Sequence, residues 1–187
     1  SHLNTSNHDG ATGDAFAWVT PLQAELVQMD QIQIHPTGEK GSYLLITEAV
    51  RGNGAILVNR EGVRFANEMW TRDKLSEAIL KQTDKSVFIV FDQSVRKSLS
   101  TIENYAHQGL LTTADTPAEL AKALKLPVDD FVNTMETYQV YQATGEDLDF
   151  HREAEEMLFP LNEAPYYAIE VEPVIHHTMG GIKINTQ

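Results

Sequence analysis

Charged side chains of complementary types gather in the stretch from Leu44 to Ile79. Thr47 can begin a short helical turn in which Glu48 and Arg51, three residues apart, share one face. Arg72 stands at the expected start of another helix, where a positive charge costs roughly 0.3 to 1 kcal/mol when exposed. Because guanidinium groups bind carboxylates well, we interpret these side chains as a surface that binds an anionic ligand and delivers protons to it. The rest of a larger protein would hold that ligand in place.

Each of these residues also has a purely structural interpretation. Glu48 and Arg51 could form a surface ion pair that contributes a few tenths of a kcal/mol. Arg72 and Asp73 could simply be the polar start of a helix. The spacing of the residues is compatible with both interpretations.

Three histidines form the second group of candidate residues. A lone histidine at a strand end, such as His35, is more often packed or solvated than functional. His176 and His177 are adjacent and are followed closely by Gly180 and Gly181. Because glycine lets a ligand or another backbone approach closely, this second cluster is the stronger indication of a binding site.

A metal site would be another use of these imidazoles. His35, His176, His177 and Glu48 carry donor types that bind zinc or iron. The H-E-x-x-H pattern is absent, and the separation of His35 from His176 along the chain carries no geometric information. We therefore expect no metal site. The absence of a G-x-S-x-G pattern also gives serine catalysis no support.

The elements that must position these side chains are strands interleaved with helices. Apolar or alternating runs predict strands over residues 31–35, 86–92, 166–171 and 182–185, and a hairpin over residues 55–65. Helical spacing predicts helices over residues 14–29 (bent or shortened by Pro21), 71–82, 93–108 in one or two pieces, 116–124 with a capping box, and 128–143. Residues 145–164 are acidic and are expected to be irregular.

No part of the chain carries the glycine pattern of a dinucleotide-binding turn. Gly52-Asn53-Gly54 has Leu57 where the third glycine of G-x-G-x-x-G would fall, and Gly10 and Gly13 follow no expected strand. The sequence therefore predicts an α+β fold, with a small mixed sheet packed by helices and no complete nucleotide-binding Rossmann domain.

The composition limits the classes of partner. The 187 residues are 42% hydrophobic, which is enough for one domain with a core. With 27 acidic against 14 basic residues, the net charge is -13, which argues against binding of nucleic acid through its phosphates. The chain has no cysteine, so disulfides and thiolate chemistry are excluded. No apolar run is long enough for a membrane span.

Six short motifs occur in order and together resemble one known family. They are Gly10-Ala11-Thr12-Gly13-Asp14, His35-Pro36-Thr37, Thr47-Glu48-Ala49-Val50-Arg51-Gly52, Asn59-Arg60-Glu61-Gly62-Val63-Arg64-Phe65-Ala66-Asn67-Glu68, Thr71-Arg72-Asp73 and His176-His177-Thr178-Met179-Gly180-Gly181. The set resembles the fumarate reductase/succinate dehydrogenase flavoprotein family, most closely the soluble fumarate reductases of the flavocytochrome c type. The resemblance spans nearly the whole chain and implies the capping (clamp) domain of a longer, FAD-dependent flavoprotein.

The resemblance also implies roles for individual residues. It implies that Arg72 is the acid that protonates the substrate carbon, and that Arg51 and Glu48 resupply its proton. The residues implied in binding the substrate, a C4 dicarboxylate such as fumarate, are His35, Thr47 and His176. Those implied to lie near the FAD cofactor are His177, Gly10, Ala11, Thr12, Gly13 and Asp14.

A division of the chain follows from the same resemblance. Residues 1–30 would flank the capping domain as part of the FAD domain, residues 31–175 would form the capping domain, and residues 176–187 would return to the FAD domain. A dinucleotide-binding region and a further substrate-binding arginine are expected outside this chain. The implied partners are the FAD domain of the parent chain and a multihaem cytochrome domain or another electron donor. The implied location is the bacterial periplasm, with the cytoplasm as the alternative.

Two residues bear on the choice of substrate, and alternatives stay open. Leu45 stands where close relatives commonly have a methionine, and His35 favours fumarate over urocanate. The alternatives are an enzyme of the same superfamily acting on succinate, urocanate, methacrylate or a 3-ketosteroid, or a stand-alone anion-binding module. We expect the isolated chain to fold, to bind FAD poorly and to have no reductase activity.

Overall fold

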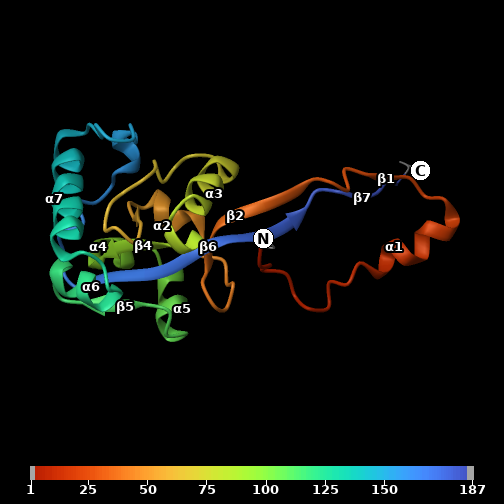
Figure 1. The fold of residues 1–187 in the computed structure, drawn as a ribbon, viewed down its shortest axis with the longest axis horizontal. Helices are drawn as coiled ribbons and strands as arrows, with labels where there is room; N and C mark the ends of the chain where they lie inside the picture. Colours follow the sequence, from red (N-terminus) through yellow and green to blue (C-terminus); the bar gives the residue numbers. More distant parts are fainter. Residues whose placement is uncertain (1–2, 185–187) are drawn as a thin grey trace.

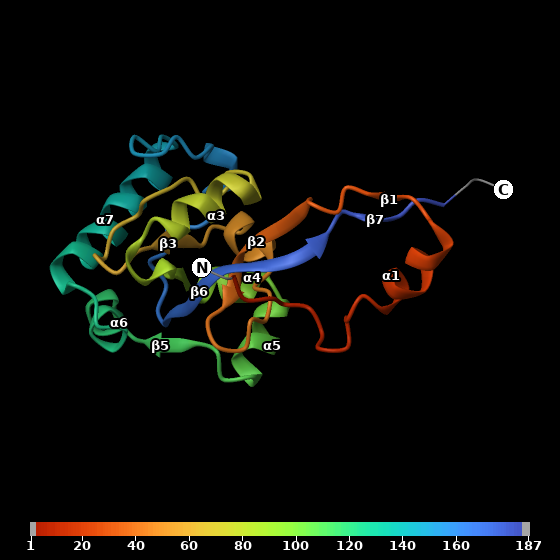
Figure 2. The same ribbon diagram turned by 45° about the vertical axis from the view of Figure 1, so that its right-hand side comes forward.

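The computed structural model describes residues 3–184, which form a globular part and an extended arm (Figures 1 and 2). The arm contains the N-terminal residues, α1 (Asp14–Val19), a 3₁₀ turn (Thr20–Leu22) and β1 (Leu26–Val27), which pairs with the C-terminal β7 (Gly181–Ile182). Two long strands, β2 (Ile32–Glu39) and β6 (Tyr166–Thr178), lead from the globular part into the arm.

A five-stranded sheet lies at the centre of the globular part. It contains β2, β6, β3 (Ile56–Val58), β4 (Val87–Asp92) and β5 (Thr112–Ala114). The first half of β6 pairs with β4 and β5, its second half pairs with β2, and β3 pairs with β4. These pairings are all antiparallel, so the α+β fold is confirmed with an antiparallel rather than a mixed sheet.

Helices surround this sheet. They are α2 (Glu48–Gly52), α3 (Arg72–Leu80), α4 (Gln93–Ser98), α5 (Thr101–His107), α6 (Pro117–Leu124) and α7 (Val128–Thr144), with short 3₁₀ turns at Thr83–Lys85 and Ala154–Glu156. Helix α3 packs against β2 and β6, and α6 packs against α7. The contact of α3 with β2 brings together the elements that carry two of the candidate site residues, because α3 begins with Arg72 and β2 carries His35.

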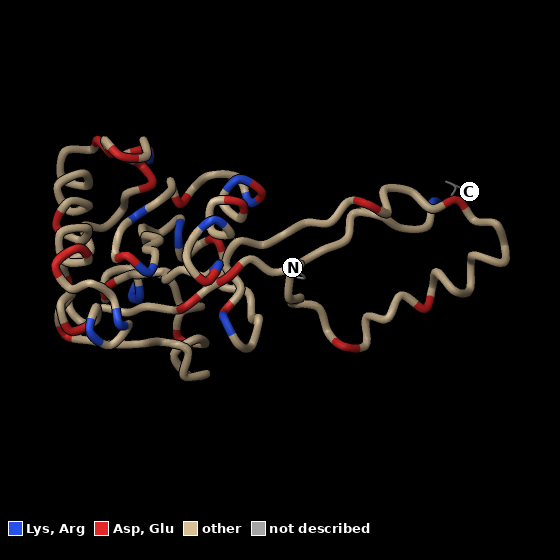
Figure 3. The backbone as a smooth tube through the Cα atoms, in the orientation of Figure 1, with Lys and Arg blue, Asp and Glu red and all other residues tan. Residues whose placement is uncertain are grey.

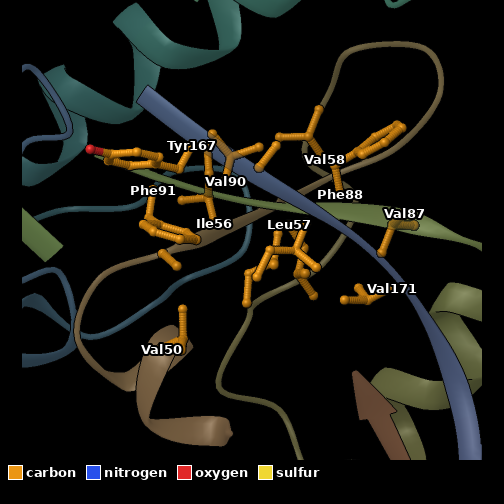
Figure 4. Packing of buried hydrophobic residues seen from close by; sticks show 14 of the residues in the cluster. Val50, Ile56, Leu57, Val58, Val87, Phe88, Val90, Phe91, Tyr167 and Val171 are labelled. Atoms are coloured by element: carbon orange, nitrogen blue, oxygen red, sulfur yellow. The ribbon is translucent and has the colours of Figure 1, made fainter. Parts of the chain in front are cut away.

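The hydrophobic core lies on both faces of the central strands. All six residues of β4 are buried, which accounts for its nearly unbroken apolar sequence. Figure 4 shows part of this core, with side chains from β3, β4 and β6 and with Val50 of α2. Val50 and Arg51 are both buried, so the short helix α2 is anchored to the core on the side next to its charged residues.

Local sequence signals explain where several helices begin and end. The Thr116 hydroxyl accepts a hydrogen bond from the Glu119 N–H, as the capping box predicts, and Pro117 occupies the first turn of α6. Asp92 caps α4 by accepting a hydrogen bond from the Val95 N–H. Gly145 adopts a left-handed conformation, with φ of 73°, and ends α7.

The structure defines two boundaries near the N-terminus. The helix over residues 14–29, predicted to be bent or shortened by Pro21, is short and ends at Val19, where a 3₁₀ turn that contains Pro21 follows it. The strand predicted to end at His35 continues past Pro36 to Glu39. The register of β2 against β6 is irregular between His35 and Gly38, and this irregularity accommodates a proline that has no N–H to donate.

Other corrections concern the strands. β6 extends to Thr178, beyond the predicted end at residue 171, and β5 was not predicted. The hairpin predicted over residues 55–65 contains the strand β3 and a single bridge between Val58 and Arg64. The last predicted strand, residues 182–185, corresponds to β7 at Gly181–Ile182, and its residue 185 lies outside the described residues.

The charges are distributed unevenly between the two parts. Figure 3 shows acidic and basic residues interleaved in the globular part, whereas the arm carries mainly acidic ones. Residues 1–31 contain neither lysine nor arginine. Any guanidinium group that this chain contributes to an anion-binding site must therefore come from the globular part.

We expect Leu57→Ala to lower the free energy of unfolding by about 2–5 kcal/mol, because Leu57 is fully buried and its truncation leaves a cavity. Leu148 is 62% exposed, so Leu148→Ala should change that free energy by no more than about 0.5 kcal/mol. Urea unfolding followed by circular dichroism measures both values. Equal effects of the two substitutions would contradict this assignment of the core.

Candidate functional site

Helix α2 presents Thr47 and Glu48 at its N-terminus. The Thr47 hydroxyl accepts a hydrogen bond from the Ala49 N–H at 3.4 Å, so this residue caps the helix. The backbone N–H of Thr47 donates to the hydroxyl of Tyr105 at 3.0 Å. Tyr105 comes from α5 and is itself buried, so a remote helix fixes the start of α2.

The carboxylate of Glu48 lies between two arginines. Its Oε2 atom is 3.3 Å from Nε of Arg72 and 4.0 Å from Nη2 of Arg51. Arg72 also donates from Nη1 to the side-chain oxygen of Gln33 on β2, at 3.0 Å. The side chains of Arg72 and Glu48 are 40% and 45% exposed, whereas that of Arg51 is 1% exposed. The three residues thus form a chain of charges from the interior to the surface, in which Glu48 and Arg51 are more than an isolated surface pair.

Arg51 is a buried cation. Its pKa is lowered to about 10, chiefly by burial and also by the charges of Arg152 and Arg72, and the carboxylates of Glu48 and Glu68 partly oppose this shift. Its Nη1 atom donates to the backbone carbonyl of Glu68. A guanidinium whose pKa is depressed in this way gives up a proton more readily than an exposed arginine does.

His35 and His176 lie side by side, because β2 pairs with β6. His35 pairs with Val174 in the register of the sheet, and the ring centroids of His35 and His176 are 5.7 Å apart in an edge-to-face arrangement. Nδ1 of His35 accepts the Thr37 N–H at 3.2 Å, which assigns the proton of the neutral ring to Nε2. His35 can therefore donate one hydrogen bond to a ligand.

The charges around His35 keep its ring neutral. Burial, together with the positive charges of Arg51 and Arg72, lowers the pKa of His35 to about 4. Because these cations influence His35 directly, the catalytic candidates and the two histidines belong to one site. The structure thus brings together Arg72, Arg51, Glu48, His35 and His176, with Thr47 next to Glu48 in the chain.

The residues assigned to cofactor binding lie on the arm. Ala11 and His177 line one pocket of about 360 Å³, whose remaining lining residues are Thr5, Asn7, His8, Asp9 and Thr178. Gly10 belongs to the same segment, followed by Thr12, Gly13 and Asp14, where α1 begins. Two ends of the chain therefore converge on a polar pocket. Its size and lining fit part of a dinucleotide cofactor such as FAD, with the rest held elsewhere.

Sequence reasoning missed several residues that support the site. Gln33 is two residues before His35 on a strand, so alternation of side chains was an available signal. Glu68 and Arg64 are four residues apart, which is also a recognisable spacing. Tyr105 and Arg152 gave no signal, because their partners are distant in the sequence.

Two further features of the described residues bear on the sequence-based expectations. Within residues 3–184, no group of three or more His, Cys, Asp or Glu side chains is arranged to hold a metal ion. Over the same range, none of the helices has the length and apolar character needed to cross a membrane.

The comparison with protein families decides the membership of the chain. The family described as "FAD binding domain" matches residues 2–187. The chain belongs to this family of FAD-binding flavoproteins.

Individual relatives of this flavoprotein chain are fumarate reductases. A protein named "Fumarate reductase (cytochrome)" from Shewanella frigidimarina is 47% identical over 183 residues, covering 98% of this chain and 32% of the relative. An "NADH:fumarate oxidoreductase" from Klebsiella pneumoniae is 44% identical over 182 residues, covering 97% and 20%. The solved open conformation of a flavocytochrome c3 fumarate reductase matches with a TM-score of 0.88 at 42% identity, covering 98% of this chain and 32% of that one. The chain thus spans about a third or less of the length of these relatives.

We expect the stability of the folded chain to fall as pH decreases from about 6.5 to about 4, in part because of His35. In that range the unfolded chain binds a proton on His35, whereas the folded chain binds it only near pH 4. The two pKa values correspond to a loss of up to about 3 kcal/mol below pH 4 and to no contribution above about pH 6.5.

Urea unfolding of the wild type and of His35→Gln, measured from pH 4 to pH 7, tests this prediction. His35→Gln should show a weaker dependence on pH than the wild type. His107→Gln, which removes an exposed histidine on α5, is the matched control and should keep the wild-type dependence. Parallel curves for the wild type and His35→Gln would show that His35 is not a buried neutral imidazole.

Proposed function

We propose that this chain is the substrate-binding and proton-delivering part of an FAD-dependent fumarate reductase, which converts fumarate to succinate. The observation that carries the proposal is the carboxylate of Glu48 between Arg51 and Arg72, beside the His35–His176 pair. The fumarate reductase names of the similar proteins support the choice of substrate.

The site can bind a dicarboxylate through complementary donors. Fumarate is a dianion, and a chain with a net charge of -13 needs a local concentration of positive charge and N–H or O–H groups to bind it. Arg72 supplies a partly exposed guanidinium, and neutral His35 supplies an Nε2–H. Thr47 and His176 would contact the remaining carboxylate oxygens.

Arg72 would deliver the proton to one alkene carbon. FAD, when bound, supplies the hydride to the other carbon. Guanidinium groups normally retain their protons, but a carbon that gains the electrons of a hydride is far more basic than a side-chain oxygen. Arg51 can then pass a proton to the Glu48 carboxylate, Glu48 can pass it on to Nε of Arg72, and Arg51 can regain a proton that comes from solvent. The fixed positive charge of Arg72 also stabilises negative charge that develops on the substrate.

The arm would complete the site as part of the FAD domain. On this proposal residues 1–30 and 176–187 belong to the FAD domain, and residues 31–175 form the capping domain. Two features of the arm support this assignment. His177 and Ala11 share a polar pocket. Large apolar side chains are also exposed there, as expected of a surface that packs against the rest of a domain: Trp18, Leu22 and Ile184. A haem-containing domain as electron donor agrees with the relative named as a cytochrome, and a periplasmic location stays a prediction.

We expect Arg72→Ala in the full-length enzyme to lower kcat for fumarate by about 10²–10⁴-fold, because the acid and a carboxylate ligand are both lost. Steady-state reduction of fumarate by a dye-linked assay measures this. Lys81→Ala is the matched control, since it removes an exposed cation at the other end of α3, and it should keep turnover near the wild-type value.

A panel of urocanate, methacrylate, succinate and a 3-ketosteroid, tested with the full-length enzyme, decides among substrates. Faster turnover of any of these than of fumarate would overturn the choice.

We expect the 187-residue chain alone to fold, to bind FAD weakly and to have no reductase activity, because it holds only part of the cofactor site. Calorimetry with FAD and with fumarate, together with the dye-linked assay, measures all three properties. Micromolar binding of fumarate without flavin would favour a stand-alone anion-binding module. Retained yellow colour with fumarate reduction would show that these residues form a complete enzyme.

A further inference from the structure

Beneath the site lies a buried arginine network, which comprises Arg51, Arg64, Glu68, Asp147 and Arg152. Their side chains are almost entirely shielded from solvent. Taking several charges out of water is costly, and a network of this kind is retained only if its members compensate one another. The role proposed above for Arg51 uses one member and leaves the other four unexplained.

Glu68 is the centre of this buried arginine network. Its carboxylate accepts from Nε and Nη2 of Arg64 at 2.9 and 2.8 Å, from Nη1 of Arg152 at 3.3 Å and from the Leu57 N–H at 3.1 Å. Asp147 holds the other side of Arg64, at 3.2 and 2.9 Å. The environment of Glu68 is therefore saturated with donors, and the positive charges of Arg64 and Arg152 keep its pKa below the usual value despite complete burial.

The network holds Arg51 from two directions. Nη1 of Arg51 donates to the backbone carbonyl of Glu68. Nη2 of Arg152 donates to the backbone carbonyl of Arg51 at 2.6 Å, and Nη1 of Arg152 donates to the carbonyl of Ala55 at 3.0 Å. Both the side chain and the main chain of Arg51 thus depend on Glu68 and Arg152. Glu68 also stands four residues before Arg72, so it links the end of α2 to the start of α3.

The remaining nitrogens of Arg51 are held weakly. Nε and Nη2 are buried and have no hydrogen-bond partner within residues 3–184, and Nη2 faces Glu48 at 4.0 Å. With three cations against two anions, the buried arginine network carries one excess positive charge. The affinity of Arg51 for its proton therefore depends largely on the charges around it. Those charged or titratable groups are Glu48 on α2, Arg72 on α3, His35 on β2, Glu68 before α3, and Arg152 in the loop after α7.

We propose that Glu68 and Arg152 are positioning residues of the site, which hold Arg51 beside Glu48 and whose opposite charges govern the release of its proton. The inference rests on the proposed role of Arg51 as a proton donor to Glu48. It adds two residues that touch neither substrate nor cofactor and that act through Arg51. It also explains why the costly network lies directly beneath the relay.

The test uses the full-length enzyme and two substitutions of opposite charge effect. Glu68→Gln removes a negative charge that favours the protonated form of Arg51. The alkaline limb of the plot of kcat against pH should therefore move to lower pH. Arg152→Met removes a positive charge, so the same limb should move to higher pH. Each shift should be on the order of one pH unit, and kcat should fall by roughly 10- to 100-fold with little change in KM.

A matched control separates these effects from loss of stability. Asp147→Asn removes a buried negative charge from the same network without touching Arg51, so it should lower the thermal midpoint and leave the pH profile in place. Arg152→Lys keeps the charge, and it should restore the wild-type position of the alkaline limb relative to Arg152→Met. If Glu68→Gln does not fold, the comparison of Arg152→Met with Arg152→Lys alone tests the positioning role.

Arg51→Met in the same enzyme separates a failure of the proton relay from a failure of the positioning role. If Arg51→Met leaves kcat unchanged, the relay itself is wrong and the positioning role falls with it. If Arg51→Met lowers kcat but the profiles of the Glu68 and Arg152 variants coincide with that of the wild type, only the positioning role is overturned. Shifts of the same sign in Glu68→Gln and Arg152→Met would also overturn it.

Discussion

The carboxylate of Glu48 is shared between a buried guanidinium and a partly exposed one, and this interaction determines the rest of the site. An arginine at the first position of α3 is unfavourable with respect to the helix dipole, and the carboxylate of Glu48 at 3.3 Å offsets that cost. The same carboxylate faces Arg51, which carries its charge into the interior. Removing the shared carboxylate would leave two cations in proximity, so the positions of α2 and α3 depend on each other.

The sheet supplies the second constraint. β6 pairs with β2 over its second half, and this pairing places His176 against His35. The irregular register at Pro36 and Thr37 turns the Thr37 N–H toward Nδ1 of His35, which directs the remaining ring proton outward. Burial and the two arginines keep this imidazole neutral. The same charges that suit an anionic ligand therefore also fix the protonation state of the histidine that would bind it.

The division between globular part and arm shows how an acidic chain could bind an anionic substrate, as the proposed function requires. Basic residues are confined almost entirely to the globular part, where α2 and α3 place two of them at one point. The arm carries the polar pocket lined by Ala11 and His177 and several exposed apolar side chains. On the proposed function, anion binding and cofactor binding would belong to different parts of the chain, joined by β2 and β6. This arrangement agrees with membership of the FAD-binding family and with the short fraction of each relative that the chain covers.

The sequence by itself determined the features that depend on neighbouring residues. The capping box at Thr116, the apolar run of β4 and the spacing of Glu48 and Arg51 each use interactions within a few residues, and the structure contains all three. The six ordered motifs also identified the family and contained Arg72, Arg51, Glu48, Thr47, His35 and His176, whereas Gln33, Tyr105 and Arg152 lie outside them. Their individual roles stay predictions.

Only the tertiary structure decided which distant residues meet. β5, the continuation of β2 past Pro36 and the extension of β6 to Thr178 arise from strand pairing, which local propensity does not encode. The contact of His35 with His176 and the hydrogen bonds from Arg72 to Gln33 and from Arg152 to the Arg51 carbonyl have the same origin. Each joins segments far apart in the chain, so its energy depends on the packed fold and has no signature in the spacing of residues.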